Sequence, residues 1–266
     1  MYLFGLCLIF LFIAGCATVG VNNYQNAETV GKKRFKAGLD WEFSRDMSVG
    51  IDIDEGIIKI TEDYPSASEF NMPSVGLTAQ YGITGSTDIG AAVNVSISSA
   101  SGKIYFKQNL VHTSGNTAIA LLPGVGIYAG GGGSGEPVFF SEPNTEYEKD
   151  NSYEGYFFDI PLIISNRWSF FSVHLSPKYT YHRLYISTEY REIRESDGEE
   201  LVHNAQKKTF DFHTYGVAAG FSFVFKRLEL TPEISFLRVN DLPKNSYRWT
   251  IYPGLGIFIK FGYKKR

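Results

Sequence analysis

The sequence predicts an all-β protein, a closed antiparallel up-and-down transmembrane β-barrel of about ten strands. Three observations lead to this fold class. The composition includes 21 Phe, 17 Tyr and 27 Gly but only 3 Met, and rich aromatics with abundant glycine favour strands over helices. Apolar and polar residues alternate with a period of two along many segments. Short turns and long polar connections follow one another along the chain, as in outer-membrane barrels.

The N-terminus is expected to be a targeting segment. Residues 2–14 are almost wholly apolar and too short to cross a bilayer as a helix. They end in Ile13-Ala14-Gly15-Cys16, which resembles the lipobox of bacterial lipoproteins. The resemblance implies a signal peptide at 1–15, a lipidated Cys16 as the first mature residue, and loss of Cys7 with the leader. Residues 16–33 are polar and aperiodic, so they are expected to form a lipidated tether, followed by the barrel at 34–266.

The first strand shows the alternation most simply. Between 34 and 43 the odd positions are Phe, Ala, Leu, Trp and Phe, and the even positions are charged or glycine. The same pattern predicts strands at 74–83, 89–97, 103–112, 117–129, 153–165, 169–186, 208–225, 228–238 and 249–263. In 208–225 the apolar parity changes between Phe212 and Tyr215, which we interpret as a β-bulge.

The connections between these segments differ in length. Short turns are predicted at 85–88, 113–116, 166–167 and 226–227, and longer connections at 44–72, 98–102, 130–152, 187–207 and 239–247. Tight turns are typical of the periplasmic end of an outer-membrane barrel and long loops of its external end. An even number of strands then places both termini on the periplasmic side.

Alternation alone leaves two orientations open, because a soluble lipid-anchored barrel would turn its apolar face inward. Three features favour lipid outside. The polar face is rich in small residues, which narrow lumens require. Each apolar face runs for about nine to eleven residues, the length that crosses a bilayer. Aromatic residues gather near the strand ends, where amphipathic rings prefer the membrane interface.

Segments 73–90 and 248–263 are similar to small outer-membrane β-barrel lipoproteins of Gram-negative bacteria. The resemblance implies a location in the cell outer membrane, with the N-terminal lipid anchor on the periplasmic side. It also implies contact with outer-membrane lipids and with the barrel assembly machinery, because the last strand resembles an assembly signal ending in the aromatic Tyr263.

Charged residues of the polar face are expected to meet inside the barrel. Those on the first strand should face those on the last strand once the barrel closes, and opposite signs should pair because buried unpaired charge is costly. The expected lumen charge cluster comprises Lys36, Asp40, Glu42, Lys178, Glu229, Glu233, Arg248 and Lys260. A lumen plugged by these pairs is favoured over a narrow channel for small solutes.

Catalysis is a further alternative. His174 and His182 share a face with Ser176 and Lys178, and an integral outer-membrane hydrolase could use such a histidine with Glu229 or Glu233 as its carboxylate. No sequence motif fixes that geometry, so we predict a non-enzymatic protein with no catalytic residue, metal site or cofactor.

The function predicted first is structural or loop-mediated binding. An extracellular ligand is expected at loops 44–72, 130–152 and 187–207, because binding residues are common on loops that a rigid scaffold holds. A net charge of −3 offers no basic stripe, so no nucleic-acid partner is predicted.

Overall fold

A computed structural model gives the fold of this chain and describes residues 23–44, 52–54, 57–59, 72–96, 99–113, 116–134, 145–194, 200–241 and 246–262. All the regular elements in these ranges are strands. They are β1 (Phe35–Ser44), β2 (Asp52–Asp54), β3 (Ile57–Lys59), β4 (Met72–Gly82), β5 (Thr87–Val95), β6 (Ser99–His112), β7 (Thr117–Leu121), β8 (Gly124–Ser134), β9 (Thr145–Asp159), β10 (Leu162–Trp168), β11 (Phe171–Arg194), β12 (Glu200–Phe225), β13 (Leu228–Asp241) and β14 (Ser246–Phe261). No helix among these residues is long and apolar enough to cross a membrane.

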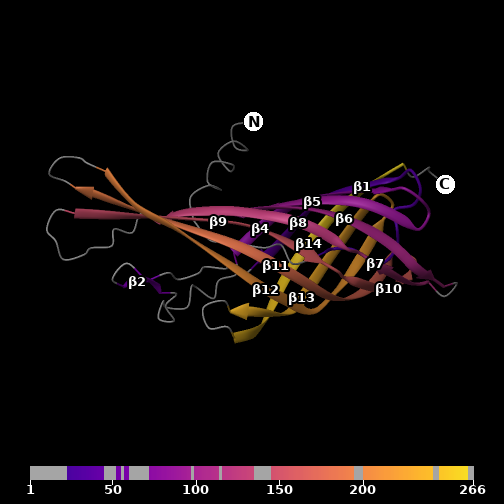
Figure 1. The fold of residues 1–266 in the computed structure, drawn as a ribbon. Helices are drawn as coiled ribbons and strands as arrows, with labels where there is room; N and C mark the ends of the chain where they lie inside the picture. Colours follow the sequence, from indigo (N-terminus) through magenta and orange to yellow (C-terminus); the bar gives the residue numbers. More distant parts are fainter. Residues whose placement is uncertain are drawn as a thin grey trace.

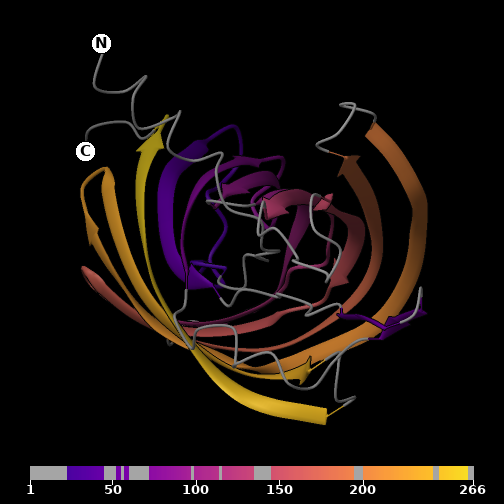
Figure 2. The same cartoon turned by 90° about the vertical axis from the view of Figure 1, so that its left-hand side faces the viewer.

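The main sheet closes on itself as a barrel (Figures 1 and 2). The pairings of this sheet are antiparallel, and β1 pairs with both β4 and β14, so the first and last strands complete the ring. β7 and β8 both pair with β6, so together they count as one interrupted strand of the ring. β9 and β10 both pair with β11 and likewise count as one interrupted strand. The barrel therefore has ten strands, which confirms the predicted fold class.

A proline lies at each of the two interruptions. Pro123 lies between β7 and β8, and Pro161 lies between β9 and β10. Proline has no N–H to donate to a neighbouring strand, so one hydrogen bond of the ladder is missing there. Their carbonyls still accept hydrogen bonds, from Phe106 N to Pro123 O at 3.0 Å and from Leu122 N to Pro161 O at 2.9 Å. Backbone hydrogen bonding therefore continues across both interruptions.

One end of the barrel carries short turns between β4 and β5, β6 and β7, β10 and β11, and β12 and β13. The turn predicted at 166–167 is wrong, because Asn166 and Arg167 remain paired with β11. The chain reverses instead after Trp168, where Ser169 adopts a φ of 31°. We call this the short-turn end.

At the opposite end several strands run far beyond their neighbours (Figure 1). β11 and β12 contain 24 and 26 residues, and they remain paired as far as Ile193 and Glu200. Much of the expected loop 187–207 is therefore strand, and β8 and β9 likewise extend into the expected loop 130–152. Continuous cross-strand pairing, which polarity does not reveal, causes both differences. We call this the long-strand end.

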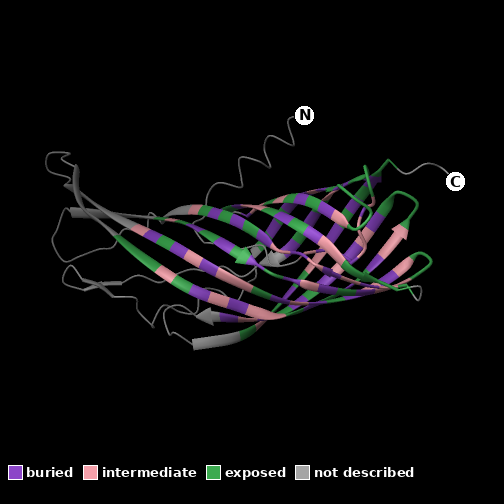
Figure 3. Ribbon diagram, turned by 45° about the vertical axis from the view of Figure 1, so that its right-hand side comes forward, coloured by how far each residue is buried: buried purple, intermediate pink, exposed green. Residues whose placement is uncertain are grey.

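Burial alternates along the strands as the sequence predicts (Figure 3). Large apolar side chains face outward; Leu77 is 64% exposed and Ile127 is 68% exposed, whereas the inward Lys36 and Glu229 are buried. A soluble protein rarely leaves so continuous an apolar surface in water. In lipid, a closed barrel satisfies every backbone group while presenting such a surface. The orientation with acyl chains outside is therefore the one that the structure supports, and the inward-apolar alternative is wrong.

The bulge interpreted between Phe212 and Tyr215 is absent. β11 and β12 keep a continuous register there, and the irregularity lies between Thr188 and Tyr190. Phe212 is simply an inward aromatic residue. Towards the long-strand end it belongs to an apolar cluster inside the barrel, with Tyr128, Phe157, Leu184 and Ile186. The interior therefore holds an apolar cluster in addition to the charged residues that the sequence predicts there.

Candidate functional site in the barrel lumen

The N-terminal part of the described chain lies inside the barrel. Tyr24 and Ala27 are 2% and 0% exposed, and the residues between them are also buried. We call residues 23–30 the plug segment. Sequence analysis places these residues in a tether, but they line the interior instead. Cys16 and the expected signal peptide lie outside the described residues.

Glu233 holds one end of the plug segment. Its Oε1 accepts a hydrogen bond from Asn23 N at 2.9 Å, and its Oε2 accepts one from Tyr24 N at 3.0 Å. The Tyr24 hydroxyl donates to Trp41 O at 3.0 Å on β1. The carboxylate thus satisfies two backbone donors that have no strand partner, as buried N–H groups require.

The other end of the plug segment is fixed near the short-turn end. Val30 N donates to Asp88 Oδ2 at 3.0 Å, and the Thr29 hydroxyl donates to Gly85 O at 2.7 Å in the β4–β5 turn. Between the two ends, Ala27 N donates to Ser165 Oγ at 3.1 Å. The plug segment is therefore bonded to the wall at both ends and in its middle.

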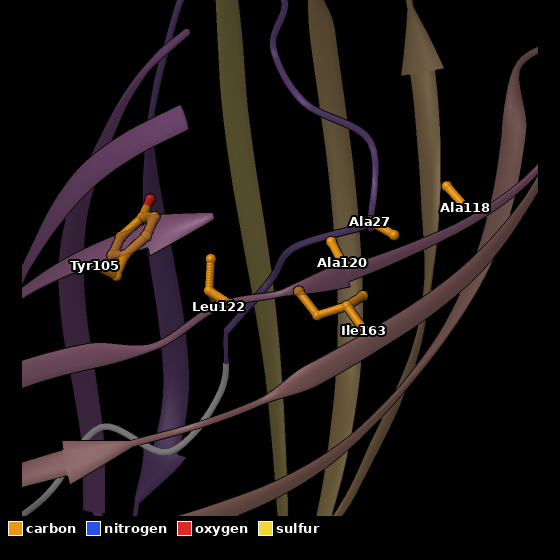
Figure 4. Packing of buried hydrophobic residues seen from close by; sticks show 6 residues of the cluster. All are labelled: Ala27, Tyr105, Ala118, Ala120, Leu122 and Ile163. Carbon is orange, nitrogen blue, oxygen red and sulfur yellow. The ribbon is translucent and has the colours of Figure 1, made fainter. Parts of the chain in front are cut away.

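Small side chains make room for this segment. Ala27 packs against Ala118, Ala120, Leu122 and Ile163 from β7, its following link and β10 (Figure 4). Ala118 and Ala120 are fully buried in this cluster, so larger side chains at these two positions would crowd the plug segment. The small residues of the polar face therefore accommodate a chain segment as well as lumen side chains.

Glycine has the same role opposite Tyr105. A Cβ on Gly90 would lie 2.2 Å from the ring of Tyr105. The Tyr105 hydroxyl in turn accepts a hydrogen bond from Gln25 Nε2 at 3.0 Å. Gly90 therefore lets the ring reach the plug segment.

Three members of the expected charge cluster meet at the seam between the first and last strands. Lys36 and Lys260 are direct cross-strand partners, and both ammonium groups approach Glu229, at 3.2 and 2.6 Å. The Lys36 ammonium also lies 4.3 Å from the centre of the Phe258 ring. Two cations thus share a single carboxylate in a buried position.

The other expected members lie elsewhere in the lumen. Asp40 Oδ2 accepts a hydrogen bond from the Thr78 hydroxyl at 2.8 Å, and Lys178 Nζ lies 3.4 Å from Ser235 Oγ. Glu42 is buried on β1. Arg248 belongs to β14, but its side chain lies outside the described residues.

Sequence analysis missed four charged residues of the lumen, on β5, β6 and β9, of which three are buried and Lys103 is half-buried. Lys103 pairs with Asp159 at 2.6 Å, and Lys107 lies 3.9 Å from Asp88. The period-two alternation along β6 could have predicted the two lysines, because Lys103 and Lys107 alternate in step with Tyr105 and so lie on the inward face of the strand.

The two histidines have different surroundings. His174 Nε2 lies 3.1 Å from Glu233 Oε2, so the structure brings together one carboxylate–histidine pair that was considered for hydrolysis. Both side chains are fully buried, and the same carboxylate binds the plug segment. His182 stacks on Phe212 with ring centres 4.5 Å apart. This geometry suits the positioning of the plug segment, because Glu233 is committed to the plug's N–H groups.

An outward polar group lies beyond the apolar belt towards the long-strand end. Arg183 on β11 donates to both oxygens of Asp211 on β12 through its Nε and Nη2, at 2.8 and 2.9 Å, and the Tyr181 hydroxyl donates to Asp211 at 2.6 Å. The hydrogen bond from Arg183 lowers the pKa of Asp211. This exposed charged group marks a position where the outward face of β11 and β12 is polar.

In the ranges that the structure covers, no group of three or more His, Cys, Asp or Glu side chains is arranged to hold a metal ion. The lumen site therefore consists of a plug segment, the polar groups that hold it and the buried ion pairs beside it.

No family model matches the chain, and no curated protein matches it. Among solved structures, the chain is similar to the translocator domain of the autotransporter NalP from Neisseria meningitidis, with 9% identity, a TM-score of 0.44, and coverage of 88% of this chain and 89% of that one. It is also similar to the CymD monoaromatic hydrocarbon channel (8% identity, TM-score 0.27, 96% and 99% covered). A third similar structure is the Ralstonia pickettii toluene transporter TbuX (9% identity, TM-score 0.22, 86% and 89% covered).

Proposed function

We propose that this protein is an outer-membrane barrel whose lumen is closed by its own plug segment and whose long strands bind a partner outside the cell. The observation that carries the proposal is the buried plug segment, tied to the wall through Glu233, Ser165 and Asp88. A segment held in the lumen in this way is expected to obstruct the passage of a solute. Under this proposal the protein functions through the surface that it presents outside the cell.

The long-strand end is the surface best suited to binding. Under this proposal the short-turn end faces the periplasm, as tight turns do in outer-membrane barrels. β11 and β12 then extend outside the cell as a paired sheet well beyond the Arg183–Asp211 group. A rigid sheet that carries loops at its tip is a common arrangement for recognition.

Single-channel recording in planar bilayers tests the closed lumen. We expect the wild-type protein to insert without steady current. A double variant, Glu233→Ala with Ser165→Ala, removes the side-chain acceptors of the Asn23, Tyr24 and Ala27 N–H groups and should produce intermittent openings. A steady wild-type current would contradict the proposal.

Trypsin treatment of intact cells tests the orientation. Arg191 and Arg194 lie near the tip of β11, so cleavage there is expected without permeabilisation. Lys226 and Arg227 in a short turn should be cut only after the outer membrane is opened. The reverse pattern would place the long strands inside the cell envelope.

A gated channel for small solutes is the second candidate, and one observation favours it. Hydrogen bonds attach both ends of the plug segment, and such bonds exchange with water more readily than packed side chains do. Openings of the wild-type protein that depend on an added solute would favour this candidate over closed-barrel binding.

We also propose that Cys16 carries the lipid anchor, on the strength of the lipobox resemblance. Labelling of cells with radioactive palmitate should mark the protein. The label should be lost in Cys16→Ser and retained in Cys7→Ser, its matched control. Retention in Cys16→Ser would exclude the anchor, whatever the fate of the barrel.

A further inference from the structure

We propose that the short-turn mouth of the lumen holds a binding site for a small soluble oxyanion, of the phosphate or carboxylate class. A cavity of about 250 Å³ lies there between the plug segment and the wall. Its lining includes six basic side chains and only two carboxylates, Glu28 and Glu229. The proposal does not depend on whether the barrel conducts or binds a partner.

The deepest cations of this cavity have too few anions beside them. Lys36 and Lys260 both rely on Glu229, which can neutralise one of them. Lys107 is 1% exposed, and its ammonium lies 3.9 Å from Asp88, whose same oxygen accepts hydrogen bonds from Val30 N and Gln80 Nε2. Three buried ammonium groups thus share two carboxylates. Because buried charge without a counter-charge is costly, a bound anion would stabilise this arrangement.

The rim of the cavity extends the positive charge to solvent. Arg34 and Lys226 both line it, and both are exposed. Arg167 also lines it, bound to Glu28 of the plug segment. A mouth lined by one sign of charge attracts the opposite ion before it enters.

The shape and surroundings define the ligand class. Ammonium and guanidinium groups form their shortest and strongest hydrogen bonds with oxyanions. The volume holds one phosphate together with several waters, at about 30 Å³ for each water. The β-strand wall separates the cavity from the acyl chains, so a free anion fits better than the headgroup of a membrane lipid.

Isothermal titration of the purified full-length protein tests the site, with sodium phosphate, sodium acetate and sodium chloride compared at equal ionic strength. We expect phosphate to bind measurably and chloride not to bind. Lys260→Met should weaken phosphate binding on the order of tenfold or more, because one charge-assisted hydrogen bond is lost. Lys178→Met is the matched control, since Lys178 is a similarly buried lumen lysine that does not line the cavity, and it should bind phosphate as the wild type does.

A second variant keeps the test decisive if Lys260→Met does not fold. Lys226→Ala changes an exposed turn residue, so the barrel should fold, and phosphate binding should still weaken. Titration in nanodiscs with and without phosphatidylglycerol distinguishes the source of the anion, because a lipid headgroup ligand would compete with phosphate. Wild-type protein that binds phosphate no better than chloride, or variants that all bind as the wild type does, would overturn the proposal.

Discussion

At the scale of single residues, Glu233 connects the plug segment to the barrel. Its two oxygens accept the N–H groups of Asn23 and Tyr24, and His174 binds the same carboxylate. Glu233→Ala leaves these two N–H groups without an acceptor, so we expect the plug segment to leave the lumen part of the time. An Ala27→Cys reporter, in a chain whose native cysteines are serine, should then react with a water-soluble maleimide.

The control for this prediction is Thr231→Ala. Thr231 lies on the same face of β13, is equally buried and bonds to Ser222 rather than to the plug segment. The reporter should stay unreactive in that variant. Equal maleimide labelling with Glu233 intact and replaced would mean that this carboxylate does not retain the plug.

Gly90 leaves room for the ring of Tyr105, which occupies the space that a side chain would fill. In Gly90→Leu the new Cβ meets the Tyr105 ring, so the ring must move and lose its bond to Gln25. Overpacking of this kind costs about 1–3 kcal/mol, which urea unfolding in detergent can measure. Gly102→Leu, at a glycine with open space around it, should change the free energy of unfolding far less.

The sequence predicted inward and outward residues well where charge and apolarity alternate, as on β1. It failed where an inward residue is aromatic, because Phe212 looks like part of the lipid face. It failed again for residues 23–30, which carry no period-two signal and whose partners Glu233 and Ser165 lie about 140 to 210 residues away in the chain. Hydrogen bonds between an irregular segment and distant strands leave no local pattern in the sequence from which they could be predicted.

At the scale of whole strands, the outward apolar side chains form a belt around the barrel. We expect the free-energy cost of introducing a charged residue into this belt to depend on its depth in the membrane. Leu77 lies near the middle of the outward face of β4, and Tyr81 lies close to its short-turn end. Leu77→Arg should destabilise the inserted barrel by about 2–4 kcal/mol and Tyr81→Arg by about 0–1 kcal/mol, since arginine near the interface reaches water. Unfolding titrations in lipid vesicles measure both. Equal costs at the two sites would contradict the position assigned to the belt.

Strand number and order were predictable because each strand is a local pattern followed by a turn. Strand length was less predictable, since β11 and β12 stay paired through residues whose polarity resembles that of a loop. Each of the two interrupted strands, at Pro123 and Pro161, is predicted from the sequence as a single strand, and the predicted count of ten is therefore correct. Pairing beyond the membrane depends on register rather than on burial, so it lies outside what alternation can indicate.

At the scale of the whole molecule, the ring and the plug segment are separable. The barrel closes through β1 and β14, whose pairing runs from Phe35 to Glu42 and involves no residue of the plug segment. The plug segment contributes hydrogen bonds inside a ring that is already complete. A chain that begins at Gly31 should therefore still form a closed barrel with heat-modifiable gel mobility.

The same truncated chain should be less stable than the full one. It loses the backbone bonds to Glu233, Ser165 and Asp88, each worth about 0.5–1.5 kcal/mol. For a barrel of this size the melting temperature should fall on the order of 10 °C, measured by circular dichroism in detergent. If the truncated chain instead fails to give a heat-modifiable band, the plug segment is needed to close the ring. The lumen bonds would then be part of the folding of the barrel rather than a later addition to it.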